Sequence, residues 1–238
     1  MVIEKIKADL KAVSKKSDVK ILQRFFKTGP GEYGEGDIFI GVRVPQQREI
    51  ARKYYSEISW SEIQTLIQSP IHEERLTALL ILVLRFEKTE IDKEKTKIYN
   101  FYLKNLKYIN NWDLVDLSAS KIVGAYIFNY KKTDKDKLFK LAEKKHLWSR
   151  RVAVIATFYF IKKGEYKTLF KLAEMLLADK HDLMHKAVGW MLREVGNNCG
   201  QEIEEEFLKK YYKKMPRTML RYAIEKFPEE KRQAYLAK

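Results

Sequence analysis

The sequence predicts an all-α protein built from repeated pairs of helices, and three observations carry this prediction. Among 238 residues there are only 10 glycines and 5 prolines, so the chain lacks the turn residues that many short strands would require. Apolar residues recur at steps of three and four along the chain, which is the spacing of one helical face. The hydrophobic share of 45%, with 13% aromatic residues, suffices for a buried core. An all-β or a disordered chain is therefore excluded.

The first part of the chain predicts two short helices, a glycine-rich loop and an extended connection. The two apolar sets, the second of which follows the N-cap candidate Ser17, are Ile3, Ile6, Leu10, Val13 and Ile21, Leu22, Phe25, Phe26. The run TGPGEYGEGD at 28–37 holds four glycines and a proline, so helix cannot continue through it. The apolar run IFIGVRV at 38–44 has no evident partner strand, so we expect an extended connection packed on helices. Helix should resume at Pro45, a residue suited to the first helical position.

Beyond Pro45 the pattern predicts helices separated by short breaks. They cover residues 45–55, 60–68, 70–87, 91–108, 112–130, 135–144, 147–163, 166–178, 182–196, 201–214 and 216–227. The second helices of successive pairs align on Arg75, Asp113, Arg151, Lys186 and Arg221, at steps of 38, 38, 35 and 35 residues. This period is typical of HEAT-like repeats, and it predicts a curved α-solenoid that forms a single domain over residues 1–238. An irregular helical bundle is the alternative.

The aligned positions and the charge distribution both predict a surface for a polyanion. One helix of every repeat lines the concave face of a solenoid, and four of the five aligned residues are cationic, so they are expected to follow a phosphate backbone. The net charge is +15, from 47 Lys and Arg against 32 Asp and Glu. Residues 5–27, 131–151 and 207–226 carry +6 each, and the rest of the chain sums to −3. Three such segments favour nucleic acid as the partner over helix faces that are merely soluble.

Cysteine content and hydropathy predict the compartment. A single cysteine, Cys199, excludes an intramolecular disulfide and any multi-cysteine metal site. The longest apolar stretch, residues 76–84, is well short of the roughly 20 residues that span a bilayer, and the N-terminal residues have no apolar signal core. We therefore expect a cytoplasmic protein with no membrane segment.

Two tryptophans and a carboxylate form the candidate reactive constellation. Trp112 and Asp116 are four residues apart in NWDLVD (111–116), so on a helix an indole and a carboxylate would share one face. Asp113, in the first turn, is expected mainly to stabilise the helix N-terminus. Trp190 lies in KAVGWMLRE (186–194) beside Gly189, which permits close approach. Indole faces and carboxylates suit a planar, cationic ligand, although a lone tryptophan is more commonly a core residue.

The motifs resemble those of a known family. They are WDLVD at 112–116, LWSRR at 147–151, HKAVGWMLREVG at 185–196, MPRTMLRYAIEKF at 215–227 and FIGVRVPQQRE at 39–49. In order and spacing the chain is similar, over nearly its whole length, to the DNA alkylation repair family of HEAT-like-repeat proteins, the AlkD-type glycosylases. The resemblance implies a solenoid that binds duplex DNA and, in active members, excises N3- or N7-alkylated purines without a metal, in base excision repair.

The resemblance also implies roles for individual residues. The family's catalytic carboxylate falls on Asp116, its two lesion-site tryptophans on Trp112 and Trp190, and its active-site arginine on Arg151, which would hold phosphate or orient Asp116. Phe25 stands where the characterised glycosylase has a tyrosine, so a phenolic hydroxyl is missing. Some relatives bind DNA without excising bases. A non-catalytic protein that binds DNA or branched DNA is therefore the alternative, and a protein scaffold is a third.

Further cations complete the expected DNA-binding surface, and other kinds of site find little support. The additional candidates for DNA contact are Arg193, Lys186, Arg48 and Arg43. His181 and His185 are four apart, but no third ligand is evident, so no metal site is expected. The glycines of residues 28–37 lack the Lys-Ser/Thr pair of a phosphate-binding loop. We expect a monomer that needs no cofactor and binds double-stranded DNA containing alkylated purines.

Overall fold

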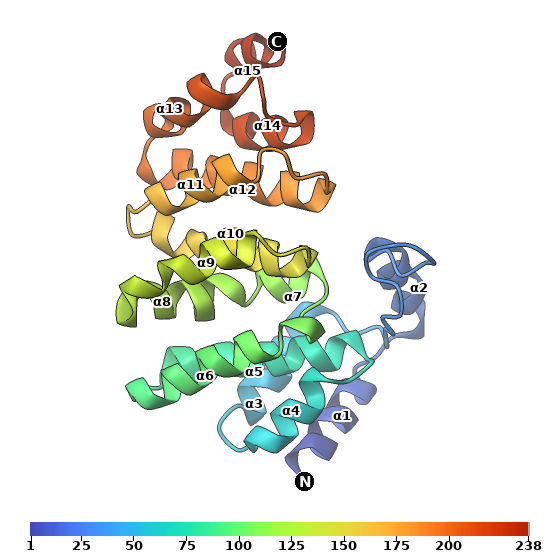
Figure 1. Cartoon of the computed structure of the whole chain (residues 1–238). Helices are drawn as coiled ribbons and strands as arrows, with labels where there is room; N and C mark the ends of the chain where they lie inside the picture. The colour runs from blue at the N-terminus through green and yellow to red at the C-terminus, as the bar shows by residue number, and fades with distance from the viewer. Residues whose placement is uncertain (238) are drawn as a thin grey trace. The chain divides into compact units, whose positions relative to one another are not determined.

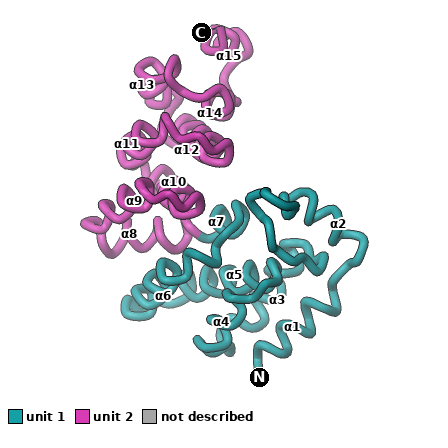
Figure 2. The backbone as a smooth tube through the Cα atoms, turned by 45° about the vertical axis from the view of Figure 1, so that its right-hand side comes forward, with its two compact units in different colours: residues 1–118 teal, residues 119–238 magenta. Residues whose placement is uncertain are grey.

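The computed structural model describes residues 1–237 and is all-α, as the sequence predicts (Figure 1). Within these residues the only β pairing is one isolated parallel bridge between Ile38 and Ile71. No described helix is both long and apolar enough to cross a membrane. The chain divides into two compact units, residues 1–118 and 119–238 (Figure 2), which are described separately below.

Unit 1 is arranged around α5, the longest of its helices. Its elements are α1 (Val2–Ala12), α2 (Lys16–Phe25), α3 (Val44–Tyr54), α4 (Trp60–Ile67), α5 (His72–Lys88), α6 (Asp92–Lys104), a 3₁₀ turn (Leu106–Tyr108) and α7 (Trp112–Asp116). Helices α1, α3, α4, α6 and α7 all pack against α5. Every residue of α5 from His72 to Val83 is buried. Because the helix is surrounded on all sides, its sequence after Arg75 is apolar around most of its circumference. Helix α2 has no buried residue.

The segment before α3 is extended and bound to α5, as predicted. The side chain of Glu73, in the first turn of α5, accepts hydrogen bonds from the backbone N–H groups of Ile40, Gly41 and Val42 at 2.9–3.2 Å. Gly41 has a φ of +87°, and a Cβ there would lie 2.2 Å from the Lys15 carbonyl oxygen. Only glycine therefore allows this close approach of the connection to the start of α2.

Several helix boundaries differ from the prediction, and those of α2, α3 and α7 bear on the candidate site. Helix α2 begins at Lys16, so Ser17 lies inside its first turn. Lys15 takes the N-cap position instead, and its N–H donates to the Gly41 carbonyl. Helix α3 begins at Val44, one residue before Pro45. The helix predicted over 112–130 is divided, since α7 ends at Asp116 and a π-helical turn (Ser120–Gly124) precedes α8 (Ala125–Tyr130).

Unit 2 is a regular succession of helix pairs. After α8 come a 3₁₀ turn (Lys132–Asp134), α9 (Lys135–Ala142), α10 (Leu147–Ile161), α11 (Lys167–Met175), α12 (Asp182–Cys199), α13 (Gln201–Tyr211), α14 (Arg217–Ala223), a 3₁₀ turn (Ile224–Lys226) and α15 (Glu229–Leu236). Helix α12 packs against both α10 and α14. Because these three helices begin at 147, 182 and 217, 35 residues apart, the predicted helix-pair period is confirmed in this unit. Helix α15 was not expected from the sequence.

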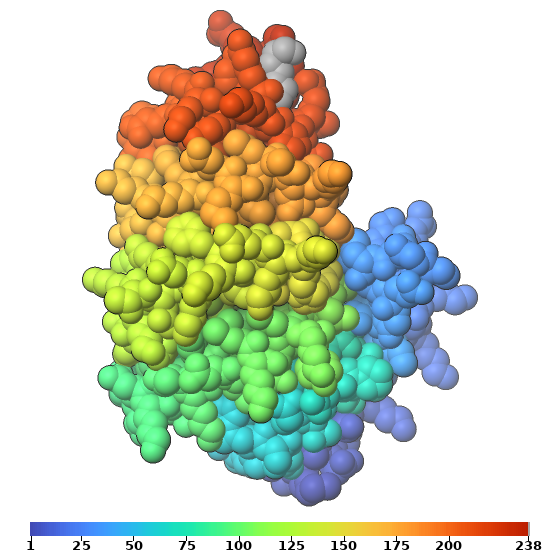
Figure 3. Space-filling model, viewed as in Figure 1, coloured from blue at the N-terminus to red at the C-terminus, as the bar shows by residue number. Residues whose placement is uncertain are grey.

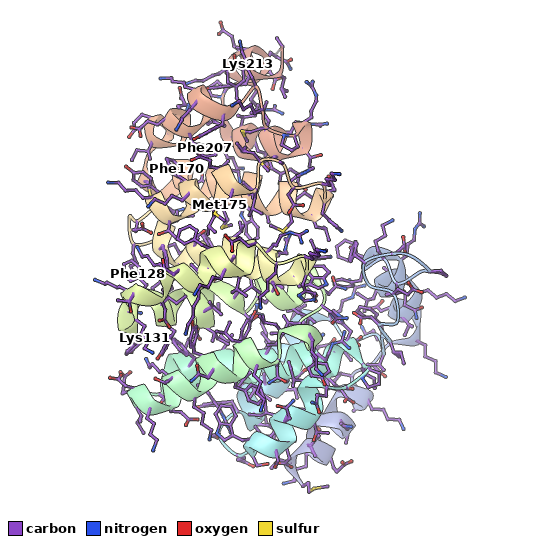
Figure 4. The ribbon with its side chains drawn as sticks, in the orientation of Figure 1. Phe128, Lys131, Phe170, Met175, Phe207 and Lys213 are labelled. Carbon is purple, nitrogen blue, oxygen red and sulfur yellow. The ribbon has the colours of Figure 1, made fainter. Side chains whose placement is uncertain are left out.

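Each pair in unit 2 mainly contacts its neighbours in the chain. Its surface accordingly forms bands that follow chain order in Figure 3, as is typical of helical repeats. The first helices of successive pairs also contact one another: Phe170 of α11 and Phe207 of α13 lie with ring centroids 5.2 Å apart (Figure 4).

Gly189 sets the distance between α12 and α14. A Cβ at this position would lie 2.3 Å from the Met219 carbonyl oxygen and 2.6 Å from the Tyr222 Cβ. Since backbone cannot yield as a flexible side chain does, Gly189→Ala should destabilise the protein by about 1–3 kcal/mol. Urea unfolding followed by circular dichroism measures this. Gly164→Ala is not a suitable control, because the φ of Gly164 is +77°. Ser61→Ala, at an exposed position, is the control. Equal stabilities of Gly189→Ala and Ser61→Ala would contradict the prediction.

Candidate active site

Helix α7 carries the candidate site residues of unit 1. Its N-terminus is capped by Asn111, whose side-chain oxygen accepts the Trp112 N–H at 2.8 Å. Trp112 and Asp116 are the first and last residues of α7, one turn apart, and both are half-buried. Burial raises the pKa of Tyr102, the hydrogen bond with Ser118 opposes this, and the negative charge of Asp116 raises it further.

Two phenylalanines from the end of α2 surround the Trp112 indole. The Phe26 ring is stacked on it, with centroids 5.1 Å apart and planes 21° from parallel. The Phe25 ring meets it edge-on at 5.6 Å and is 60% exposed. Phe25 thus lies directly beside Trp112 but offers only an apolar edge.

A buried ionic cluster lies next to α7. The two ring nitrogens of His72 lie 3.0 Å from Asp37 Oδ2 and 2.8 Å from Asp113 Oδ2, and Arg75 Nη2 donates to Asp37 Oδ1 at 2.6 Å. Burial lowers the pKa of His72, but the charge and hydrogen bond of Asp113 and the hydrogen bond of Asp37 outweigh it and raise this pKa to about 9. Asp113 does lie in the first turn of α7, yet it is buried and pairs with His72, beyond the capping role that its position predicted.

The sequence signalled this cluster only weakly. Asp37 closes the glycine-rich loop, His72 begins α5 and Asp113 lies in α7. They come from three separated segments, so no spacing rule joins them.

Arg75 does not belong to the predicted cationic surface. The register predicted Arg75 on the concave, DNA-binding face, but it is only 4% exposed and is bound to Asp37 and to the Ser69 carbonyl. It neutralises an internal carboxylate and cannot follow a phosphate backbone. Of the other aligned cations, Arg221 is exposed and Lys186 is partly exposed, whereas Arg151 is buried.

Helices α10 and α12 position the remaining candidates in unit 2. Arg151 Nη1 donates to the Leu183 carbonyl at 2.6 Å, which connects α10 to the first turn of α12. Trp190, half-buried, donates from its indole N–H to Glu194 Oε1 at 3.1 Å, and its ring lies 6.0 Å from that of Phe158 on α10. The Trp190 indole is therefore held by its polar edge as well as by packing.

The candidate DNA-contacting cations have partners within the protein. Arg193 pairs with Glu225 and lies 3.5 Å from Glu194, and Lys186 pairs with Asp182 at 2.7 Å, one turn away. These pairs lie at or near the surface, where such contacts are weak and exchangeable.

The cations of α3 are placed differently from one another. The Arg43 side chain, before the first turn of α3, bonds Asp18 of α2 at 2.7 Å, which joins the two helices. Arg48 is half-exposed on α3.

The two histidines of the rejected metal pair have structural partners. His181 Nδ1 accepts the Leu183 N–H at the start of α12, and the His185 ring nitrogen Nε2 lies 2.5 Å from the Asp179 carbonyl oxygen. Among residues 1–237 there is no group of three or more His, Cys, Asp or Glu side chains that could hold a metal ion.

Comparison with known proteins identifies the family. The family model described as DNA alkylation repair enzyme matches residues 6–227. A solved structure described as a predicted DNA alkylation repair enzyme from Enterococcus faecalis has a TM-score of 0.69 and 16% sequence identity, and the match covers 91% of this chain and 97% of that one. No curated protein matches the chain. Because the family match spans nearly the whole sequence, including every candidate site residue, the chain belongs to the DNA alkylation repair enzyme family.

Proposed function

We propose that the protein is a DNA glycosylase that excises positively charged N3- or N7-alkylated purines from double-stranded DNA. The observation that carries the proposal is α7, where Trp112 and Asp116 lie one helical turn apart at positions that match the family's motif. Arg151 is the proposed active-site arginine and Trp190 the second lesion-site tryptophan. In this proposal the protein acts as a monomer in the cytoplasm.

The proposed chemistry requires stabilisation of one developing charge. An N3- or N7-alkylated purine is already cationic, so it leaves as a neutral base when the N-glycosidic bond breaks and takes the bonding electrons. Positive charge then develops on the deoxyribose. A preorganised carboxylate at Asp116 stabilises this charge, or orients the water that attacks C1′ and loses a proton. The face of Trp112 adds attraction to a cation. Because the leaving group is activated by its own charge, the reaction needs no metal or organic cofactor.

Phe25 favours a second candidate, a family member that binds DNA without cleaving it. Its exposed ring lies against Trp112 but has no hydroxyl to donate to a phosphate or a water. If that hydroxyl is required for excision, only binding remains, and Phe25→Tyr should then create activity.

The experiment that tests the proposal is single-turnover release of 7-methylguanine from duplex DNA, with undamaged duplex as the binding control. The proposed function predicts release above the spontaneous rate, together with binding that weakens steeply as salt rises. Tight, salt-sensitive binding without release of 7-methylguanine or 3-methyladenine would support the non-catalytic alternative. Absence of salt-sensitive DNA binding would overturn both.

Trp190 and the lysines after α13 should differ in what they contribute. Trp190→Ala is expected to slow excision about tenfold or more while leaving non-specific DNA affinity nearly unchanged, because a lesion-facing indole interacts with the cationic base. Changing Lys213 (Figure 4) and Lys214 together to alanine should weaken binding and lower its salt dependence, because both side chains are exposed cations. Filter binding and single-turnover kinetics measure the two effects, and equal losses of affinity in both variants would contradict this division.

A further inference from the structure

His72 is surrounded by carboxylates on both edges of its ring. Nδ1 lies 3.0 Å from Asp37 and Nε2 lies 2.8 Å from Asp113, and the three side chains are almost completely buried. An ionised carboxylate only accepts hydrogen bonds, so both ring nitrogens must donate to satisfy both partners. This requires the doubly protonated imidazolium form of His72.

The charges around His72 balance only in that form. Asp37 faces it from the loop after α2, Asp113 faces it from α7, and Arg75 lies on its own helix against Asp37. With a charged His72, two carboxylates meet two cations. Deprotonation would leave one buried negative charge without a counterion, which is costly in the core.

The neighbouring residues do not offset this charge. Asn110 and Asn111 donate neutral side-chain hydrogen bonds to Asp37. The carboxylate of Glu73, the next residue of α5, is bound to the backbone N–H groups of residues 40–42. The raised pKa of His72 agrees with this arrangement, and it keeps the ring charged at neutral pH.

Two physical routes connect His72 to the Trp112 indole. One is an aromatic cluster, in which the Phe26 ring lies 5.1 Å from the rings of His72, Phe39 and Trp112 alike, and Phe39 stacks on His72 at 4.5 Å. The other is the backbone of α7, because Asp113, the partner of His72, directly follows Trp112. Both routes end on the residue that forms one wall of the proposed lesion site.

We infer that His72 is a positioning residue for Trp112. The charged imidazolium of His72 joins the loop that ends at Asp37 to helix α7, and it thereby sets the orientation of the Trp112 indole. His72 touches neither the base nor the sugar in this proposal. Its effect on excision rests on the proposed function, whereas its effect on the orientation of Trp112 does not.

The first test follows the protein without DNA. In protein labelled with 5-fluorotryptophan, the Trp112 resonance is assigned by its loss in Trp112→Phe. We expect this resonance to move as pH rises through the pKa of His72, and to be displaced at pH 7 in His72→Gln with the pH step abolished. His146→Gln is the matched control, since His146 is an exposed histidine of unit 2 and its variant should keep the wild-type resonance and pH step. A Trp112 resonance that His72→Gln leaves unchanged would overturn the inference.

A second measurement uses the unmodified chain, in case His72→Gln does not fold. Long-range ¹H–¹⁵N spectra should show protons on both His72 ring nitrogens at pH 7, and a neutral tautomer at that pH would overturn the inference. Asp113→Asn, which retains one carboxylate partner for the ring, provides a milder variant. It should also displace the Trp112 resonance and lower the pH at which His72 titrates.

Kinetics separates this inference from the proposed function. If the wild-type chain excises 7-methylguanine, His72→Gln should slow single-turnover release about tenfold or more, with unchanged affinity for undamaged duplex, since a misplaced site residue costs rate more than binding. If the wild-type chain excises nothing, the proposed function fails, and the fluorine and nitrogen spectra still decide the role of His72. Excision at the wild-type rate in His72→Gln would overturn the effect of His72 on excision, but not its effect on the orientation of Trp112.

Discussion

Replacing Asp116 by asparagine is expected to reduce single-turnover release of 7-methylguanine by about 10²- to 10³-fold at matched DNA occupancy, the loss typical of one preorganised electrostatic group. The substitution keeps the size of the side chain but removes the negative charge that would stabilise the cationic sugar. Because removing a carboxylate also reduces repulsion of DNA, affinity for duplex should hold or increase slightly. Single-turnover kinetics at saturating protein separates rate from affinity.

Asp92→Asn is the matched control for this change. Asp92 is an exposed carboxylate in the first turn of α6, in the same unit as Asp116, so its variant loses the same charge away from α7. We expect wild-type excision from it. Equal rates in Asp116→Asn and Asp92→Asn would remove Asp116 from the mechanism, and a loss of rate in both would indicate an effect of net charge.

Replacing Glu204 by glutamine should stabilise the protein at alkaline pH. Glu204 of α13 is only 2% exposed, its Oε1 is buried without a hydrogen-bond partner among the described residues, and its Oε2 packs against Gly196. Burial and the charge of Glu205 raise its pKa to about 9, with Arg193 acting in the opposite direction. The folded protein therefore holds a proton that the unfolded chain, with a pKa near 4.5, releases at neutral pH.

The direction of the pH effect follows from these two values. Below pH 4.5 the carboxyl is neutral in both states and costs nothing by linkage, and between pH 4.5 and about 9 the wild-type free energy of unfolding falls as pH rises. We expect Glu204→Gln to exceed wild type by at least about 1 kcal/mol at pH 8 and to approach it near pH 5. Urea unfolding followed by circular dichroism at both pH values measures the difference.

Glu206→Gln isolates the effect of burial. Glu206 is exposed on the same helix, so the unfolding free energy of its variant should follow wild type at both pH values. If Glu204→Gln shows the same stability difference from wild type at pH 5 as at pH 8, the carboxyl of Glu204 is not held protonated by the fold.

The candidate site was predictable from the sequence where its geometry is local. Trp112 and Asp116 share one helical turn because four residues span a turn, and Asn111 is a residue type that caps helices. The contact of Phe25 with Trp112 joins residues that are distant in the chain, so only the fold brings the two rings together. Arg75 illustrates the limit of the repeat register, because its environment includes Asp37, which comes from the glycine-rich loop and is distant in the sequence.

The sequence by itself determined the all-α class, most helix positions and the 35-residue period of unit 2, because helical periodicity and turn residues act over a few neighbouring residues. It also determined the family, through motifs spread over most of the chain. The tertiary structure alone decided that His72 is held between Asp37 and Asp113 and that Glu204 is buried without compensation. A buried charge depends on which groups surround it in space, and residues from three separated segments carry no common period along the chain.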